Sequence, residues 1–262
     1  MPPLRFPILS PLPVQVVGRF REELLPLLAD TPLVPLPPEA RETPALVISY
    51  GGDGTLLAAE REFPGIPKLP IRDRSHNPRC PHHGERSCLN DFLQGNTPAR
   101  IFPKLQAIGP EGKTLLALND LAIVRHLHPL GAIRIRIRQD GALLFPQVIA
   151  DALIVATPYG ATGYFQSITR GTFQQGLGLA FSNPVEGESF LVLRPDASLD
   201  VELLRGPALV QAGNNPQGFS LQEGEHLQVA LSPKTATLYG LEAFRCRESQ
   251  RLRQDGLPSP RP

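Results

Sequence analysis

Three consecutive stretches decide the fold prediction: Ala45-Leu-Val-Ile-Ser-Tyr50, Gly51-Gly-Asp-Gly-Thr55 and Leu56-Leu-Ala-Ala-Glu-Arg61. The first is a short apolar run, which is typical of a buried strand. The last has the composition of a helix. The glycines between them allow a sharp turn and a close approach of the backbone to a ligand. The order strand, turn, helix therefore predicts an α/β fold in this part of the chain.

The glycine turn has the features of a phosphate site, and it also carries a carboxylate. Amide groups at the start of the following helix would point at a bound anion. Asp53 would repel a phosphate unless it binds a metal ion or takes a proton from an attacking hydroxyl, and both roles belong to phosphoryl transfer. No Gly-Lys-Ser/Thr sequence follows, so the turn is not a P-loop. The alternative is a plain connection in which Asp53 caps the helix.

The composition narrows the class of protein. A chain of 262 residues holds one large or two small domains, and its net charge of +1 gives no sign of a nucleic-acid-binding surface. No apolar run is long enough to cross a membrane, and the proline-rich start predicts no signal peptide. Three cysteines, Cys80, Cys88 and Cys246, do not make a disulfide framework. We therefore expect a cytoplasmic protein without nucleic-acid or membrane partners.

The sequence pattern changes near residue 100. Before it, a strand within 11–21 and a helix at 22–29 join the strand and helix around the glycine turn. After it, short alternating segments predict strands at 115–125, 132–138, 142–148, 152–156, 189–193, 201–204, 208–211, 226–231 and 236–239. We predict a Rossmann-like α/β N-terminal domain at 1–98, a mainly β domain at 99–240 and a C-terminal segment at 241–262. The proline-rich end of that segment is predicted to be disordered.

The clearest alternation is Ile133-Arg-Ile-Arg-Ile-Arg138. Its isoleucines face one way and its arginines the other, which predicts a half-buried strand. Asp140-Gly141 follows and predicts a hairpin turn. The arginines are interpreted as the solvated face of an antiparallel sheet in preference to a nucleic-acid surface.

Two further stretches carry polar groups beside apolar runs. In Asp151-Ala-Leu-Ile-Val-Ala-Thr-Pro-Tyr-Gly-Ala-Thr-Gly-Tyr164, a buried strand leads into a turn rich in hydroxyls. The hydroxyls of this region can hydrogen-bond sugars, amides or phosphates; they belong to Thr157, Thr162, Tyr164 and Ser167. In Leu118-Asn119-Asp120-Leu121, an amide beside a carboxylate can read an adenine edge and hold ribose hydroxyls. The alternatives are an ordinary strand-to-loop junction and an ordinary turn.

These three stretches, in this order, resemble the NAD kinase family. The family carries GGDGT, then an Asn-Glu or Asn-Asp pair, then an Asp-Gly segment that ends in Thr-Pro-Thr-Gly-Ser-Thr-Ala-Tyr. The resemblance covers residues 45–245 and includes Arg194-Pro195 near a late strand. GGDGT alone is shared with diacylglycerol and sphingosine kinases, so the set of three motifs is the specific signal. The resemblance implies an NAD-kinase-like fold, with the middle domain binding NAD and the start of the C-terminal segment packing on the first domain.

The resemblance also implies an activity: phosphoryl transfer from ATP, or polyphosphate, to the 2′-hydroxyl of the NAD adenosine ribose, giving NADP. Asp53 would be the base, and Mg²⁺ would accompany ATP. Gly51, Gly52, Gly54 and Thr55 would line the phosphate site, and Asn119 and Asp120 would hold the adenosine. The dinucleotide pocket would be completed by Asp151, Thr157, Thr162, Gly163, Tyr164 and Ser167. A homodimer or homotetramer is expected.

The chain departs from the family pattern at three places. Leu69-Pro-Ile-Arg-Asp-Arg-Ser-His76 replaces a glycine-rich segment, Ser167-Ile-Thr-Arg170 replaces Ser-Gly-Gly, and Ala212-Gly213-Asn214 replaces Asp-Gly-Gln. These departures keep a second function open, a catalytically inactive or altered nucleotide-binding paralogue. A lipid kinase of the GGDGT class is the third alternative.

The segment 72–88 is interpreted as a polar, basic loop rich in proline and histidine. This loop has three interpretations. A zinc site formed by Cys80, His82, His83 and Cys88 is the least favoured, because this spacing fits no common zinc module. A solvated loop and a phosphate-facing loop are both preferred to it. The arginines of the phosphate-facing loop would be Arg72, Arg74, Arg79 and Arg86.

Overall fold

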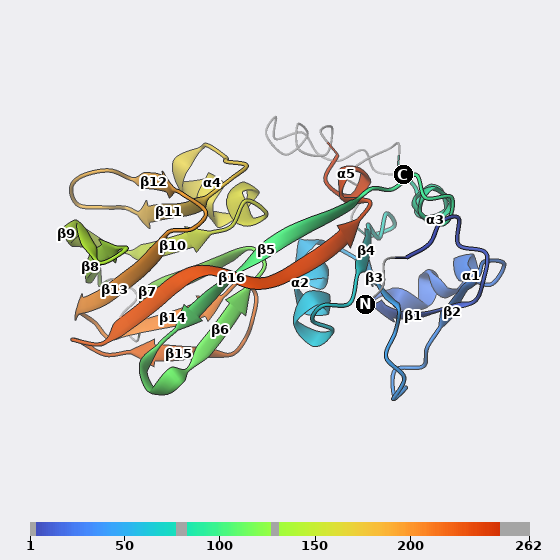
Figure 1. Cartoon of the computed structure of the whole chain (residues 1–262), viewed down its shortest axis with the longest axis horizontal. Coiled ribbons are helices and arrows are strands. Elements are labelled where there is room, and N and C mark those ends of the chain that lie inside the picture. Colours follow the sequence, from blue (N-terminus) through green and yellow to red (C-terminus); the bar gives the residue numbers. More distant parts are fainter. Residues whose placement is uncertain (1–3, 77–82, 127–130, 247–262) are drawn as a thin grey trace. The chain divides into compact units, whose positions relative to one another are not determined.

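The computed structural model describes residues 4–76, 83–126 and 131–246. They form two compact units (Figure 1), one made of residues up to 101 together with 236–246, the other of residues 102–235. The first unit is α/β with parallel strands and the second is mainly β, which confirms the predicted fold class. Every helix in these described ranges is too short or too polar to span a membrane.

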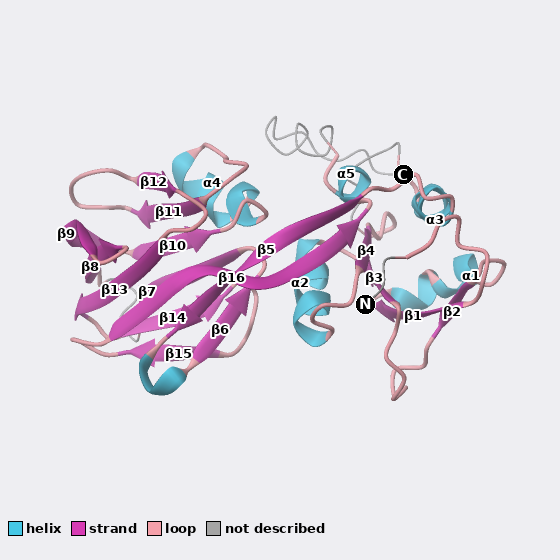
Figure 2. Cartoon of the chain, viewed as in Figure 1, coloured by secondary structure: helices cyan, strands magenta, loops and turns pink. Residues whose placement is uncertain are grey.

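The first unit is built on a parallel sheet with strand order β2-β1-β3-β4-β16. The strands are β1 (Leu12–Val17), β2 (Leu33–Pro35), β3 (Leu46–Tyr50), β4 (Lys68–Ile71) and the end of β16 (His226–Tyr239). The helices, cyan in Figure 2, are α1 (Leu25–Leu28), α2 (Asp53–Glu62), α3 (Glu85–Leu93) and α5 (Leu241–Phe244), with a 3-10 turn at Arg21–Glu23. All residues of β3 and β4 are buried, as expected of central strands in a parallel sheet.

Helix α2 follows β3 directly and packs against β3 and β4. Just before α2, the amide of Gly51 donates to the carbonyl of Ile71, the last residue of β4, at 2.9 Å. An aromatic cluster joins the start of this unit to its last strand. The ring centroids of Phe6, Phe92 and Tyr239 lie 5.3–5.7 Å apart in edge-on arrangements. This edge-on geometry is the one that aromatic pairs prefer.

The second unit contains two sheets that share one apolar core. The six-stranded sheet has the order β12-β11-β10-β7-β14-β15 and is antiparallel throughout. Its strands are β7 (Asp120–Arg125), β10 (Ala152–Ala156), β11 (Leu177–Ser182), β12 (Phe190–Leu193), β14 (Ala208–Ala212) and β15 (Gly218–Leu221). The other sheet uses β5 (Ala99–Ile108), β6 (Thr114–Ala117), β8 (Ile133–Gln139), β9 (Ala142–Ala150), β13 (Ser198–Arg205) and the first part of β16. Short helical segments lie at Pro110–Gly112, at Gly160–Thr162 and in α4 (Tyr164–Thr169).

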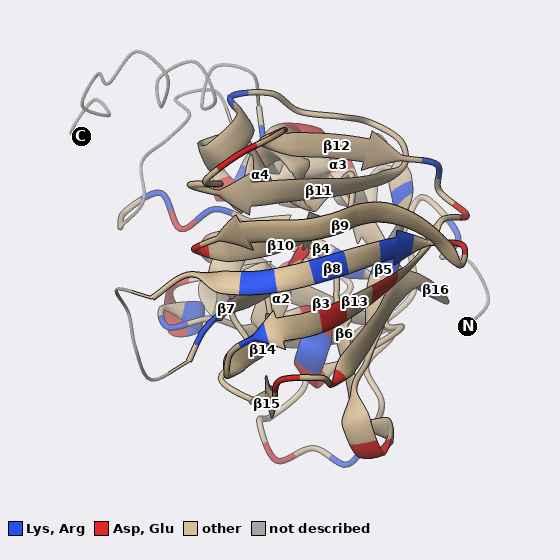
Figure 3. Cartoon of the chain, turned by 90° about the vertical axis from the view of Figure 1, so that its left-hand side faces the viewer, with Lys and Arg blue, Asp and Glu red and all other residues tan. Residues whose placement is uncertain are grey.

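Strand β8 confirms the interpretation of the alternating segment. Its isoleucines are fully buried in the core, and its arginines lie on the opposite face, where blue bands on β8 adjoin red bands on β13 in Figure 3. Arg136 donates to a carboxylate oxygen of Glu202 at 2.6 Å. The hairpin at Asp140-Gly141 is also confirmed, because both residues have positive φ, 51° and 82°, as a type I′ turn requires.

Several predicted boundaries were wrong. The predicted strand at 115–125 is two strands, β6 and β7, separated at Leu118-Asn119. The two predicted strands at 226–231 and 236–239 are the single strand β16. Pro233 lies between them at an exposed position, where the strand continues although proline has no amide to donate. The predicted loop at 72–88 contains the start of α3. Strands β2, β4, β5, β11 and β15 and helices α4 and α5 were missed, because their sequences lack a clear period.

Candidate active site

The glycine turn connects the end of β3 to the first turn of α2, and its conformation requires glycine at position 51. Gly51 has φ of 152°, and a Cβ atom there would lie 2.4 Å from Oγ1 of Thr55. Gly52 precedes Asp53 as the N-cap residue of α2. The predicted phosphate-site residues Gly51, Gly52, Gly54 and Thr55 are therefore brought together around the start of one helix.

Asp53 is held by two arginines of the first unit. Arg245 donates from Nε and Nη2 to Oδ1 of Asp53, at 2.9 and 2.7 Å. Arg72 donates from Nη2 to the other carboxylate oxygen at 3.0 Å. The Asp53 side chain is 30% exposed, whereas those of Arg72 and Arg245 are 11% and 19% exposed. Both carboxylate oxygens of Asp53, the candidate base, therefore accept hydrogen bonds from arginine side chains.

Arg72 is itself fixed in place by the end of α5. Its Nε donates to the carbonyl of Phe244 at 3.2 Å, and its guanidinium carbon lies 4.0 Å from the centre of the Phe244 ring. Stacking on an aromatic face is a favourable arrangement for a guanidinium. One Nη group of Arg72 also lies 3.5 Å from where a Cβ atom of Gly52 would stand, so Arg72 lies beside the glycine turn.

The two arginines determine the protonation state of Asp53. Burial alone would raise the pKa of this carboxyl, but the positive charges of Arg245 and Arg72 and their hydrogen bonds outweigh burial and lower the pKa to about 2. Asp53 is therefore ionised throughout the neutral range. In the arrangement described here, it is a weak proton acceptor.

A second group of predicted residues meets in the second unit, where β7 begins and β10 ends. Asp120 is the register partner of Ala156 in the antiparallel pair of these strands. The Thr157 hydroxyl, which is fully buried, donates to the carbonyl of Leu118 at 2.6 Å and accepts from the Gly160 amide at 3.1 Å. The Thr157 amide donates to the carbonyl of Asn119 at 2.8 Å. These bonds tie the Asn119-Asp120 pair to the turn that follows β10.

Three glycines allow close packing around the Asn119-Asp120 pair. A Cβ atom at Gly160 would lie 2.1 Å from the Asn119 carbonyl oxygen, and one at Gly213 would lie 2.4 Å from Asn119 Oδ1. A Cβ atom at Gly163 would lie 3.7 Å from Oδ2 of Asp120. Gly160 and Gly163 were both expected to leave room for a flat ligand, whereas Gly213 was not predicted as a site residue. The positive φ of Gly213, 49°, is the local reason for glycine at that position.

Asp120 is a buried carboxyl, with only 7% of the residue exposed. Burial raises its pKa, and a hydrogen bond from Asn119 offsets this only in part, so the pKa lies at about 6. A carboxylate that is costly to ionise in the unliganded protein is suited to accept hydrogen bonds from a bound diol, which would repay part of the desolvation.

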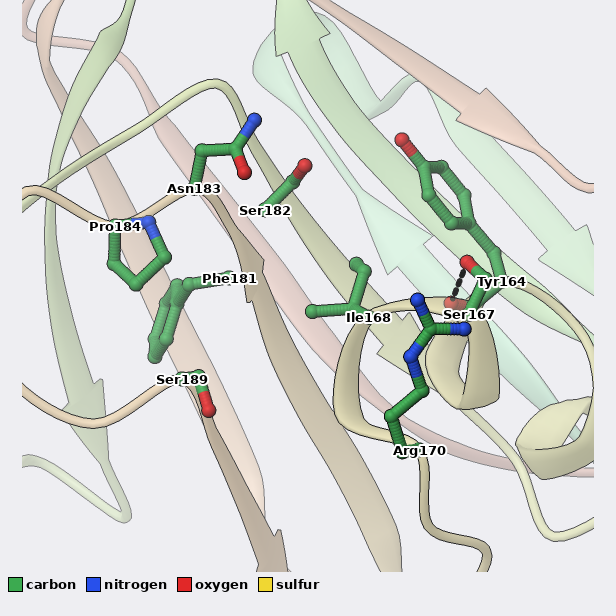
Figure 4. A pocket seen from close by; sticks show the side chains of 9 residues that line it. All are labelled: Tyr164, Ser167, Ile168, Arg170, Phe181, Ser182, Asn183, Pro184 and Ser189. Carbon is green, nitrogen blue, oxygen red and sulfur yellow. Dashed lines mark hydrogen bonds between the residues drawn. The ribbon is translucent and has the colours of Figure 1, made fainter.

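Two more of the predicted residues, Tyr164 and Ser167, line a hollow of about 400 Å³ in the second unit (Figure 4). Tyr164 and Ser167, from α4, line one side, and Ser182 and Asn183, at the end of β11, line another. Arg170, in a left-handed conformation at the end of α4, also borders the hollow. The Ser167 hydroxyl donates to the Tyr164 carbonyl at 2.7 Å, which is the dashed line in Figure 4.

Asp151 and Thr162 occupy separate positions. Asp151 precedes β10 and so lies at the opposite end of that strand from Thr157. It accepts a hydrogen bond at 2.7 Å from Asn183, which lines the hollow. Thr162 is exposed in the short helical turn before α4. Asp151 is therefore not brought to the Asn119-Asp120 pair, and its connection is to the hollow.

The candidate zinc site falls partly outside the described residues, because Cys80 and His82 lie in 77–82. Arg79, one of the arginines of the phosphate-facing interpretation, also lies there. Within the described ranges, no group of three or more His, Cys, Asp or Glu side chains is arranged to hold a metal ion.

Sequence reasoning missed Arg245, Asn183 and Gly213. Arg245 follows α5 at the end of the described chain, far from the glycine turn in sequence, so no local pattern could link it to Asp53. For Gly213 a signal did exist, since a glycine beside an asparagine indicates a turn with positive φ.

Comparisons with known proteins agree with this description. The NAD kinase of Bordetella avium (strain 197N) is 30% identical over 216 residues, which cover 76% of this chain and 72% of the relative. The NAD kinase of Ralstonia nicotianae (strain ATCC BAA-1114 / GMI1000) is 27% identical over 222 residues, covering 80% and 72%. No family model matches the chain.

Two solved structures share the fold. An NAD kinase from Archaeoglobus fulgidus in complex with ATP has a TM-score of 0.72 at 21% identity, covering 91% of this chain and 99% of that one. Yeast NADH kinase complexed with NADH has a TM-score of 0.74 at 15% identity, covering 96% and 90%. At these identities the similarity establishes the fold alone.

The similarity to these kinases identifies the chain as a phosphotransferase of the kinase type. The identity to the Bordetella avium enzyme extends over most of both chains. The chain belongs to the NAD kinase family.

Proposed function

We propose that this protein transfers the terminal phosphoryl group of ATP to the 2′-hydroxyl of the NAD adenosine ribose. In this reaction the hydroxyl O–H bond breaks, a new O–P bond forms, and ADP leaves with the electrons of the broken P–O bond. The observation that carries the proposal is the position of Asp53, in the first turn of α2 directly after a parallel strand. There it lies beside helix amides that favour phosphate.

Each predicted site residue has a role in this proposal. Asp53 accepts the proton of the 2′-hydroxyl. Gly51, Gly52, Gly54 and Thr55 allow the phosphates to approach the start of α2. Asn119 and Asp120 hold the adenosine, in the arrangement that the Thr157 hydrogen bonds fix. The rest of the dinucleotide is held by Thr157, Thr162, Gly163, Tyr164 and Ser167, with Asp151 acting through Asn183.

One observation favours the second candidate function, an inactive or altered nucleotide-binding paralogue. A general base works best when its pKa is near the working pH, and the pKa of Asp53 is about 2. If Arg72 and Arg245 still hydrogen-bond to Asp53 when both substrates are present, the chain would bind nucleotides without turnover. A lipid kinase is not proposed, because the curated relatives are NAD kinases.

Several finer features belong to the same proposal. Mg²⁺ is commonly bound by phosphate oxygens and water, with few protein ligands, so we propose that it arrives with the donor. Polyphosphate is an alternative donor, and NADH an alternative acceptor. We also propose a homodimer or homotetramer located in the cytoplasm, with domains at 1–98 and 99–240 and the C-terminal segment at 241–262.

The test is a direct assay of the purified chain with NAD, ATP and Mg²⁺, in which NADP is measured by a dehydrogenase specific for it. We expect NADP to form, and polyphosphate and NADH should be tried in parallel reactions. The matched control is Asp53→Asn, which should reduce the rate by about 10²–10⁴. NAD binding without NADP formation under every donor would favour the inactive paralogue, and absence of both would contradict the whole proposal.

A further inference from the structure

Two arginines share the single carboxylate of Asp53. Arg72 follows β4 and Arg245 follows α5, and their guanidinium groups converge at the first turn of α2. Two cations and one anion leave these three side chains with a net positive charge. The start of the ten-residue helix α2 adds to the positive potential at the same place. The geometry is that of an anion-binding site in which a side chain of the protein supplies the anion.

Resting on the proposed function, we propose that Arg72 and Arg245 bind the phosphate groups of the phosphoryl donor, and that Asp53 occupies their guanidinium groups until the donor arrives. A triphosphate carries more negative charge than one carboxylate and offers more acceptor oxygens. Guanidinium groups bind phosphate through paired N–H donors, so the exchange of Asp53 for phosphate keeps their hydrogen bonds satisfied.

The packing of Arg72 prepares it for this exchange. Its Nε donates to the Phe244 carbonyl and its guanidinium carbon lies over the Phe244 ring, so the direction of its Nη groups does not depend on Asp53 alone. Arg245 uses both Nε and Nη2 on one oxygen of Asp53, which is the fork that a phosphate group can also engage. Both side chains are mostly buried, so little rotamer freedom remains to be lost when the donor binds.

The exchange would couple donor binding to activation of the base. While both arginines contact Asp53, their charges hold its pKa well below its ordinary value. Once phosphate oxygens neutralise the arginines, the pKa of Asp53 rises towards the range of a working base. Asp53 then takes the 2′-hydroxyl proton as the O–P bond forms and the bond to the leaving nucleoside diphosphate breaks. The base is therefore released only when there is a phosphoryl group to transfer.

The first experiment measures binding of inorganic tripolyphosphate and of ATP to the full-length chain by calorimetry, without NAD. Arg72→Ala and Arg245→Ala should each weaken binding by about 10-fold or more. The matched control is Arg41→Ala, which removes an exposed arginine between β2 and β3 and should leave binding unchanged. Arg245→Lys keeps the charge but not the fork, and it provides an intermediate value if the alanine variant unfolds.

The second experiment tests the place-holder role of Asp53 with a double-mutant cycle. Asp53→Asn should tighten tripolyphosphate binding several-fold, because the internal competitor for the arginines is gone. The same substitution in an Arg72→Ala/Arg245→Ala background should give little gain. An equal gain in both backgrounds would mean simple charge repulsion and would overturn the inference, as would arginine variants that bind like the wild type.

These outcomes separate the inference from the proposed function. If the wild type makes NADP but the Arg72→Ala and Arg245→Ala variants bind tripolyphosphate as tightly as the wild type, only the inference about the arginines is contradicted. A chain that binds tripolyphosphate through them but makes no NADP would contradict the proposed function and leave the phosphate site standing.

Discussion

The buried hydroxyl of Thr157 donates a 2.6 Å hydrogen bond to the carbonyl of Leu118, across 39 residues of sequence. The same hydroxyl accepts a hydrogen bond from the Gly160 amide, so one side chain links the segment that carries Asn119 and Asp120 to the turn that follows β10. Thr157→Val keeps the shape but removes the hydroxyl, and we expect it to lower the free energy of unfolding by about 1–3 kcal/mol. Urea unfolding followed by circular dichroism measures this. Thr157→Ser is the control, since it keeps the hydroxyl, and a serine variant as unstable as the valine variant would argue against the hydrogen bond.

Gly213 touches the Asn119 side chain so closely that a methyl group there should displace it. We expect Gly213→Ala to weaken the thermal stabilisation that NAD gives to the wild type. Gly187→Ala is a matched control, because Gly187 also has positive φ, 85°, but has nothing within 4 Å of its would-be Cβ atom. Both variants share the backbone strain, so only Gly213→Ala should lose the NAD response. Equal losses in the two variants would point to strain alone.

The ion pairs of Asp53 should make stability depend on pH at the acid end. The folded pKa, about 2, lies below the ordinary value of 3.8, so the contribution is present above pH 3.8 and is lost as the pH falls towards 2. Asp53→Asn lacks this contribution, which is on the order of 2 kcal/mol. The stability gap between wild type and variant should be constant near neutral pH and shrink below about pH 4. Urea unfolding at a series of pH values measures the gap, and a gap that persists unchanged in acid would contradict the ion pairs.

Asp120 should have the opposite pH dependence. Its folded pKa, about 6, lies above the ordinary 3.8, so the protonated carboxyl stabilises the fold below pH 3.8 and this contribution is lost as the pH rises through 6. Asp120→Asn mimics the protonated form. The variant should match the wild type near about pH 4 and exceed it above about pH 6, by on the order of 2 kcal/mol. Thermal unfolding across this range tests the prediction, and a variant less stable than the wild type at neutral pH would refute it.

The interpretation of segment 72–88 can be checked by metal analysis. We expect no stoichiometric zinc after purification without added metal, because the spacing of the two cysteines and two histidines fits no common zinc module. About one zinc per chain, released by a chelator together with a change confined to this segment, would reverse this interpretation.

Much of the fold could be predicted because several strands, turns and helices have clear local sequence patterns. The alternation around Ile135 and the turn at Asp140-Gly141 fixed a strand and a hairpin, and the glycine turn at Gly51 fixed a strand and a helix. Strand β16 could not be predicted as one element, since Pro233 removes an amide from its middle. The short helix α4 was hidden by its glycine-rich, hydroxyl-rich surroundings.

The candidate site was only partly predictable. Asn119, Asp120, Thr157 and Gly163 were recognised from local motifs, and the structure brings them together. The partners of Asp53 could not be found in this way, because Arg245 reaches it through tertiary packing and arginine is common on surfaces. The same holds for the bond between Asn183 and Asp151, which depends on the pairing of β10 with β11.

The return of residues 236–246 to the first unit has a consequence for synthesis on the ribosome. A chain that emerges from its N-terminus has made β1 to β4 long before Tyr239 or Arg245 exists. The parallel sheet therefore lacks its last strand, and Asp53 lacks one of its arginines, until the whole second unit has been translated. Folding of the second unit can precede completion of the first, although domains more often fold in the order of translation. A released chain truncated just before residue 236 should consequently contain a folded β-rich unit and an unfinished nucleotide site.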